Sequence, residues 1–178
     1  LTPKQDQNVP TLGTDGNYLY YNQEFLNKLT FDEACGVVLH EVLHCVFLHL
    51  WRREKRHRFK FNVATDFAIN PIVNEIFPMP KGSLLDTKYQ GLSAEEIYDL
   101  LPDPIKVQVW CDKDMWEGSG SDKGIMGRIK KKLTKEDAER TQNNKRKWSK
   151  IFRDTILKQY GTMPDSIKRV VENNYYNP

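Results

Sequence analysis

Cysteine is scarce in this sequence and is not arranged for cross-linking. The 178 residues include Cys35, Cys45 and Cys111, an odd number with no CxxC pair. That pattern argues against a disulfide framework and against a thiolate zinc ribbon. We therefore expect a protein of a reducing, cytoplasmic compartment.

Long apolar runs are also missing. No run approaches the roughly 18 to 20 residues that span a bilayer, and 39% hydrophobic with 29% charged residues is ordinary for a globular protein. The opening, LTPKQDQNVP, lacks the charged start and apolar centre of a secretory signal, and the missing initial Met is consistent with a fragment of a longer protein. We expect no membrane segment, and most simply one domain with a helical appendage.

Positive charge is in slight excess and is clustered. The formal net charge is +3, and basic residues gather at positions 52–60 and between Arg128 and Lys150. Such clusters can contact phosphates or acidic surfaces. Aromatic side chains are not interleaved with them and no nucleic-acid-binding module is recognisable, so a solvated polar surface is favoured over a nucleic-acid partner.

Two capping boxes mark the starts of helices. Thr30 and Glu33 predict a helix from about Phe31 to Arg53, and Ser93 with Glu96 predicts a short helix over 94–101. In such a box the two side chains satisfy each other's backbone donors, which makes the start of the helix specific.

Other local signals complete the secondary structure. A turn at Asp15-Gly16 predicts a strand in the Tyr-rich run that follows, and alternating apolar residues at 105–109 predict another strand before a loop rich in Gly, Ser and Asp. A helix is expected from Val63, capped by Asn62, to about Asn70, with a kink or restart at Pro71. Apolar spacing predicts a further helix from Thr134 to a stop at Gly161, with Trp148, Ile151, Phe152, Thr155 and Ile156 on one face, and a final helix carrying Ile167, Val170, Val171 and Tyr175.

Three of the four histidines stand in one apolar segment, GVVLHEVLHCVFLHLWRR, at positions 36–53. On a helix His40 and His44 lie one turn apart, about 40 degrees round the axis, and Glu41 lies about 100 degrees from His40. This is the HExxH spacing, in which two neutral histidines hold zinc and the glutamate is the general base for a metal-activated water. A chance pair of core histidines is disfavoured, because a desolvated His/Glu/His trio without a ligand would be costly.

A catalytic zinc normally has a third protein ligand and an open position. His49 would lie about 180 degrees from His40 on a continuous helix, so it is rejected unless the helix breaks first. The elongated motif needs a third histidine where this chain has Leu50. Asp66, on the next helix, can meet the first helix if the connection folds back, and it is the favoured ligand over an Asp that caps or pairs locally.

The sequence leaves more than one role open for the other residues near the predicted metal. Asn70, one turn after Asp66, either orients a ligand histidine by a hydrogen bond or merely caps its helix. Candidate donors to substrate or an oxyanion, each more simply explained by packing or a surface position, are Tyr18, Tyr20, Tyr21, His49 and His57. Should Asp66 not be a ligand, the next candidates are Glu75, His57, Asp112 and Asp114.

Three ordered blocks carry a resemblance. TDGNYLYYNQEF, LHEVLHCVFLHLWRR and FNVATDFAINPIV, over positions 14–73, resemble the metallopeptidase domain that commonly precedes a von Willebrand factor A-like domain in bacterial and phage proteins. The resemblance implies a zincin-like fold and a zinc site of two histidines and an aspartate, mapped to His40, His44 and Asp66 with Glu41 as base. Pro71 departs from the polar residue expected there. The closing GTMPDSIKRVVENNYYNP resembles the helical segment that leads into the A-like domain, so that partner is expected to follow this chain.

Together these observations predict an α+β, mainly helical, zincin-like metallopeptidase domain with a small sheet over residues 1–133, and a C-terminal helical segment over 134–178 packed on it. The expected activity is zinc-dependent hydrolysis of peptide bonds in a protein or peptide substrate, with the Tyr-rich strand as an edge that lines the cleft. The alternative is a non-catalytic module of the same fold that recruits a protein or nucleic-acid partner. A protease acting on DNA-bound proteins is a third reading, but its usual zinc ribbon would need the CxxC pairs that are absent.

Overall fold

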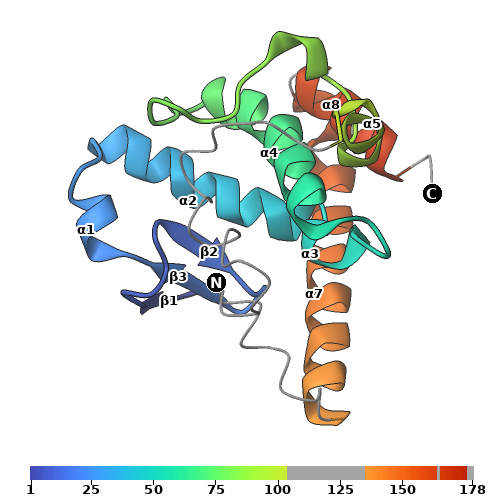
Figure 1. The fold of residues 1–178 in the computed structure, drawn as a ribbon. Coiled ribbons are helices and arrows are strands. Elements are labelled where there is room, and N and C mark those ends of the chain that lie inside the picture. Colours follow the sequence, from blue (N-terminus) through green and yellow to red (C-terminus); the bar gives the residue numbers. More distant parts are fainter. Residues whose placement is uncertain (104–134, 164, 176–178) are drawn as a thin grey trace.

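The computed structural model describes residues 1–103, 135–163 and 165–175. Within this part the protein is mainly helical with one small sheet, as the sequence predicts, and the sheet has three strands (Figure 1). The elements are β1 (Thr2–Gln5), β2 (Leu12–Thr14), β3 (Tyr18–Tyr21), α1 (Gln23–Leu26), α2 (Phe31–Val46), α3 (His49–Arg52), α4 (Arg58–Asn74), the 3-10 turn η1 (Thr87–Tyr89), α5 (Ala94–Leu100), α7 (Lys135–Gln159), the 3-10 turn η3 (Tyr160–Thr162) and α8 (Asp165–Tyr175).

The predicted Tyr-rich strand exists, but it is the centre of the sheet and not an edge. The strand order is β1-β3-β2, with β1 parallel and β2 antiparallel to β3. The turn between β2 and β3 is built as expected, because Oδ1 of Asp15 accepts from the backbone N–H groups of Asn17 and Tyr18, and Gly16 takes a φ of 87°. The expectation of an edge at β3 is therefore wrong, since the sequence signals of β1 and β2 are too short to be recognised.

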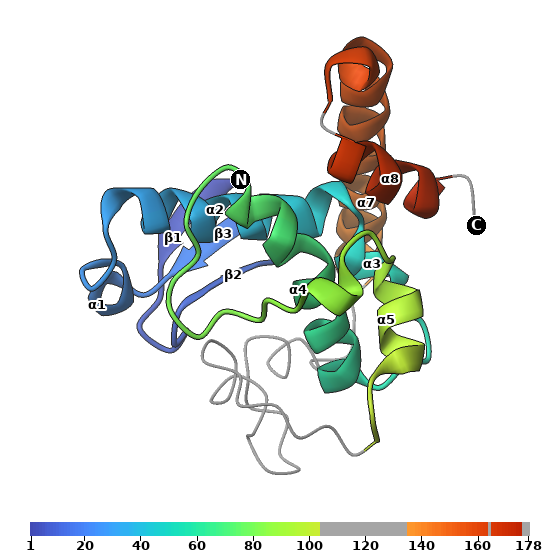
Figure 2. The same ribbon diagram turned by 90° about the horizontal axis from the view of Figure 1, so that it is seen from above.

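Helix α2 lies along the sheet (Figure 2). Its N-terminus has the predicted capping box of Thr30 and Glu33. Val37 of α2 packs with Leu12 and Leu19 of the sheet and with Phe25 of α1 in one apolar cluster. This burial fixes the helix against the sheet, so the direction of every other α2 side chain is set as well.

Helix α2 ends earlier than predicted. The expected end was Arg53, but the last helical residue is Val46, Leu48 adopts the left-handed conformation with φ 59° and ψ 24°, and the short α3 follows. No Gly or Pro marks this break in the sequence. Tertiary contacts stabilise it instead: the guanidinium of Arg52 donates to the backbone oxygen of Phe47, and the buried Phe47 ring packs on Phe152 of α7.

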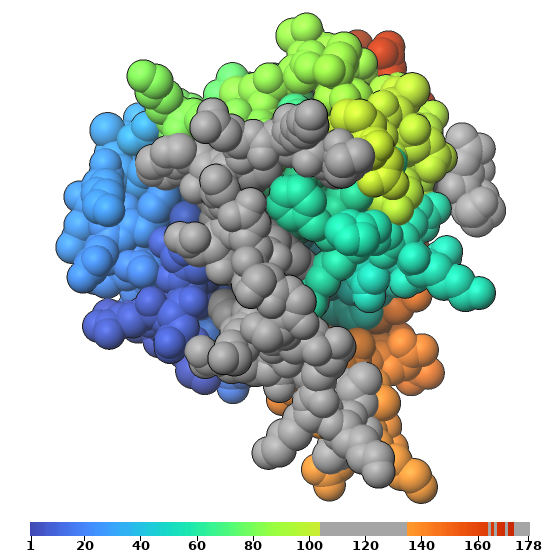
Figure 3. Space-filling view, in the orientation of Figure 1, coloured from blue at the N-terminus to red at the C-terminus, as the bar shows by residue number. Residues whose placement is uncertain are grey.

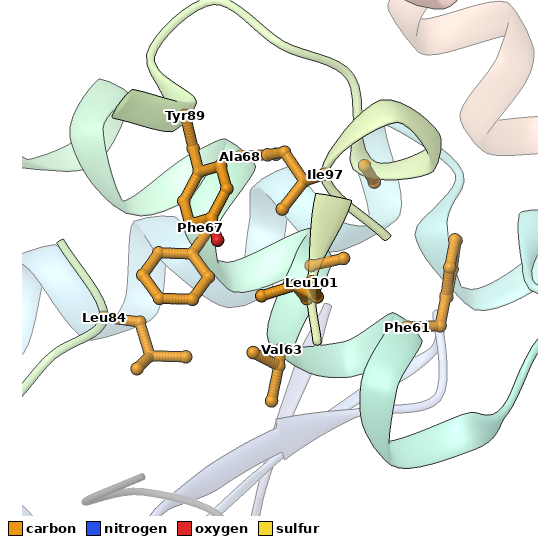
Figure 4. Packing of buried hydrophobic residues seen from close by; sticks show 10 residues of the cluster. Phe61, Val63, Phe67, Ala68, Leu84, Tyr89, Ile97 and Leu101 are labelled. Carbon is orange, nitrogen blue, oxygen red and sulfur yellow. The ribbon is translucent and has the colours of Figure 1, made fainter. Parts of the chain in front are cut away.

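Helix α4 is longer than predicted at both ends. It begins at Arg58 with His57 as its cap, where Asn62 was expected, and it continues through Pro71 to Asn74. Proline removes one backbone donor from the ladder, yet the burial of α4 side chains holds the helix together on both sides of it. The residues from Val63 to Asn70 are all buried, and α4 packs on α5 through a cluster centred on Phe67, Ala68 and Ile97 (Figure 4).

The C-terminal helices pack on the rest of the protein. Phe152 of α7 and Val171 of α8 join Phe47, Ile69 and Ile72 in one buried cluster. The buried face of α7 is narrower than the apolar face that the sequence predicts. Trp148 and Phe152 are buried, whereas Ile151 and Thr155 are exposed. In the space-filling view α7 (orange) projects beyond the sheet and α2 (blue) (Figure 3).

The remaining predictions concern residues 104–134, membrane spans and cysteines. The strand at 105–109, the loop after it and the boundary at 133/134 all lie within 104–134 and are outside the description. None of the helices that are described is long and apolar enough to cross a bilayer. Cys35 and Cys45 are free thiols.

One hydrogen bond ties α7 to the turn between β2 and β3, and we predict that its contribution to stability can be measured. The indole Nε1 of Trp148 donates to the backbone oxygen of Gly16 at 2.9 Å. Trp148→Phe keeps an aromatic ring but removes the donor, so the free energy of unfolding should fall by about 1 to 3 kcal/mol. Urea unfolding monitored by circular dichroism tests this, with Leu157→Ala on the exposed side of α7 as the control that changes it by less than about 0.5 kcal/mol.

Candidate metal centre

The two histidines of the HExxH segment face each other across one turn of α2. Nε2 of His40 and Nε2 of His44 lie 2.9 Å apart, and the ring centroids are separated by 4.5 Å in an edge-to-face arrangement. Their side chains are only 15% and 10% exposed. The pair therefore presents two ring nitrogens to a single enclosed point.

Asp66 reaches the same point from α4. Its Oδ1 lies 3.3 Å from Nε2 of His44 and 3.7 Å from Nε2 of His40. Two ligand atoms held on a tetrahedral zinc at about 2.0 to 2.2 Å are about 3.3 to 3.6 Å apart. The separations between the three groups lie around this value, so two imidazoles and one carboxylate could hold a metal ion of that size.

Burial keeps both histidines in the neutral form that binds a metal. Desolvation lowers the pKa of His40 to about 4, and the neighbouring His44 adds to the shift. Desolvation also lowers the pKa of His44 to about 4. At neutral pH neither ring is charged, so their contacts with Asp66 are not ion pairs and both Nε2 atoms are available as ligands.

Asn70 lies behind His40, on the side away from His44. Its Oδ1 is 2.7 Å from Nδ1 of His40, and its Nδ2 donates to the backbone oxygen of Leu84 at 3.0 Å. Because the amide nitrogen is used by Leu84, the amide oxygen must face the ring, and Nδ1 of His40 carries the proton that it accepts. This leaves a lone pair on Nε2 of His40, which faces Asp66 and His44.

Glu41 follows His40 on α2 and is half-buried. Burial raises the pKa of the Cys45 thiol to about 12, and the charge of Glu41, one helical turn away, contributes to the same shift. A thiol must ionise before it binds a metal. Cys45 therefore stays a neutral, buried group, and its thiol contacts the hydroxyl of Thr14.

His49 lies next to His44, because α2 breaks before it. The helical-wheel argument rejected His49 as a ligand unless the helix breaks first, and the left-handed Leu48 is that break. The three groups that converge on the candidate metal point are still His40, His44 and Asp66. Nδ1 of His49 lies 3.3 Å from Nδ1 of His44, and the residue is buried. Desolvation, His44, Arg52 and His40 hold the pKa of His49 well below its usual value, so this ring is neutral as well.

The other candidate donors are engaged in ordinary structural contacts. The hydroxyl of Tyr20 donates to Asp15, and desolvation, followed by the charge of Asp15 and this hydrogen bond, raises the pKa of Tyr20 to about 12. Tyr21 packs against the apolar cluster between the sheet and α2, and Tyr18 is exposed. Nδ1 of His57 accepts a hydrogen bond from the backbone N–H of Lys60. Of the alternative third ligands, Glu75 caps the exposed end of α4, whereas Asp112 and Asp114 lie outside the described residues.

Comparison with known proteins identifies the class of this domain. The family model described as "Putative metallopeptidase domain" matches residues 1–173 of the chain. The chain belongs to this family, which confirms the resemblance carried by the three sequence blocks. No curated protein and no solved structure gives a significant match.

The hydrogen bonds of Asn70 predict a measurable contribution to stability in the absence of metal. Asn70→Ala removes the donor of the Leu84 oxygen and the acceptor of the His40 proton at a site that is 3% exposed. We expect the free energy of unfolding to fall by about 1 to 3 kcal/mol in protein treated with a chelator. Asn74→Ala, one turn further on, removes only a solvent-exposed acceptor of the Met79 N–H and should cost less than about 1 kcal/mol, and equal losses would contradict the prediction.

Proposed function

We propose that this protein is a zinc-dependent metallopeptidase. The proposal is supported by one observation above all, the convergence of His40, His44 and Asp66 from two helices on one enclosed point. Membership of a family described as metallopeptidase domains supports the same chemistry. Glu41, which a purely structural site does not need, favours an enzyme over a site that only stabilises the fold.

Zinc is the metal that the donor set favours. Neutral imidazole suits zinc, copper, iron and nickel, whereas magnesium and calcium prefer sites made of oxygen ligands. Two histidines and one carboxylate make up the ligand set of several catalytic zinc sites, in which the fourth position is open. We assign the three ligands to Nε2 of His40, Nε2 of His44 and the carboxylate of Asp66.

The proposed mechanism assigns one proton-transfer role to the chain. When bound, zinc supplies a Lewis acid that polarises the scissile carbonyl and makes water acidic enough to attack at neutral pH. Glu41 takes the proton of the attacking water and gives it to the nitrogen of the leaving amine. Asn70 keeps the ring of His40 in the orientation and tautomer in which Nε2 faces the metal.

The substrate that we propose is an extended protein or peptide segment. Among the described residues β2 pairs with β3 along one side, and Thr14 of β2 contacts Cys45, the residue after His44. A peptide added to the other side of β2 would lie beside α2, with its backbone held by strand addition. The von Willebrand factor A-like partner and the cytoplasmic setting stay predictions from the sequence.

Zinc content is the first test. We expect purified native protein to bind one zinc ion per chain by elemental analysis, and His44→Ala and Asp66→Ala to lose it or bind it far more weakly. His57→Ala, a histidine that caps α4, is the control that should retain it. Unchanged zinc affinity in Asp66→Ala would contradict the assignment and direct the search to Glu75, His57, Asp112 or Asp114.

Peptide cleavage is the second test. The native protein should cleave members of a peptide library, and Glu41→Gln should lower the rate by about 10²- to 10⁴-fold because the general base is lost. Zinc content should be unchanged in this variant, and Glu24→Gln, on the exposed α1, should cleave normally. Zinc binding without cleavage of any peptide would instead favour the non-catalytic module that recruits a partner.

A further inference from the structure

His49 is held beside His44 by a strained turn. Leu48 has a left-handed backbone, which costs a residue other than glycine roughly 1 to 2 kcal/mol. The chain on either side is fixed, since Phe47 is buried against Phe152 and Arg52 bonds both the oxygen of Phe47 and the carboxylate of Glu95. Strained backbone of this kind gathers at functional sites, where the surrounding structure over-determines it.

The turn places two ring nitrogens within hydrogen-bonding distance. Nδ1 of His49 and Nδ1 of His44 are 3.3 Å apart, while Nε2 of His44 faces His40 and Asp66. Two nitrogens at this distance need one proton between them, carried by one ring and accepted by the other. Which ring donates depends on how His44 uses its other nitrogen.

A metal at the His/His/Asp point decides the direction of this bond. If Nε2 of His44 is a ligand, it carries no proton, so the proton of the neutral ring must be on Nδ1. Nδ1 of His44 then donates, and Nδ1 of His49 is the acceptor that it meets. His49 in this state keeps its own proton on Nε2.

We propose that His49 is a positioning residue of the metal centre, which accepts the Nδ1 proton of His44 and thereby fixes that ring with Nε2 toward the cation. His49 would orient the ring of His44 in the way that Asn70 orients the ring of His40. In that second pair, Oδ1 of Asn70 lies 2.7 Å from Nδ1 of His40. Each ligand histidine is then held by one acceptor behind it, and outer contacts of this kind typically change metal affinity 10- to 100-fold. The inference rests on the metal site of the proposed function, but not on peptide hydrolysis.

Two substitutions separate positioning from packing. In His49→Asn the side-chain oxygen takes the position of Nδ1 and can still accept the hydrogen bond from His44. In His49→Leu the side chain occupies similar space but has no acceptor. We expect His49→Leu to weaken zinc binding by about 10- to 100-fold, and His49→Asn to restore most of the lost affinity. The measurement is competition against a chromogenic chelator, with His57→Leu as the control at a surface histidine.

A second measurement does not depend on either variant folding. Long-range proton–nitrogen correlation spectra of the native protein report the tautomer of each of its four histidines. With zinc bound, protons should be found on Nδ1 of His44 and Nε2 of His49. A proton on Nδ1 of His49, or coordination of His44 through Nδ1, would overturn the proposal.

The outcomes distinguish this inference from the proposed function. Equal zinc affinity in native protein, His49→Leu and His49→Asn would overturn the role of His49 and leave the zinc site standing. Absence of zinc binding by the native protein would overturn both. Zinc binding that is weakened in His49→Leu and rescued in His49→Asn, in a protein that cleaves no peptide, would support the role of His49 while the hydrolytic activity failed.

Discussion

The packing of α2 against α4 is the contact on which the rest of the structure depends. It brings the Nε2 atoms of His40 and His44 within about 4 Å of the carboxylate of Asp66, in a place with little solvent. Removing a carboxylate and two imidazoles from water costs free energy, and apolar burial along α4 from Val63 to Asn70 offsets that cost. A divalent cation at the point where they meet would offset part of the remaining cost, because it would accept a lone pair from each of the three groups.

His40 and His44 have different surroundings, although both rings are metal ligands in the site that we propose. Behind His40 stands an amide whose orientation is fixed by a backbone carbonyl, so its role as an acceptor is fixed by the fold. Behind His44 stands another imidazole, which can donate or accept. In the proposed site, His40 is therefore held by an acceptor that the fold fixes, whereas His44 and His49 can exchange tautomers, and a bound cation would decide which tautomer is adopted.

Helix α7, near the C-terminal end of the described chain, packs on the elements that carry the candidate metal centre. Trp148 on α7 bonds the turn between β2 and β3, and Phe152 on the same helix packs on Phe47, where α2 stops. The helix that the sequence assigns to a C-terminal segment thus contacts both the sheet and the end of the ligand-bearing helix. This contact at Phe47 lies directly before Leu48, where the left-handed backbone turns the chain and sets the position of His49.

The sequence alone determined what is local in this protein. Both capping boxes, the Asp15-Gly16 turn and the one-turn spacing of His40 and His44 depend on residues a few positions apart, and each is found as predicted. The meeting of Asp66 with the two histidines was expected on the condition that the connection between the helices folds back, and the structure brings the three side chains together. Only the tertiary structure decided the break at Leu48, the passage of α4 through Pro71 and the central place of β3, since in each case burial against distant residues overcame the local preference of the backbone.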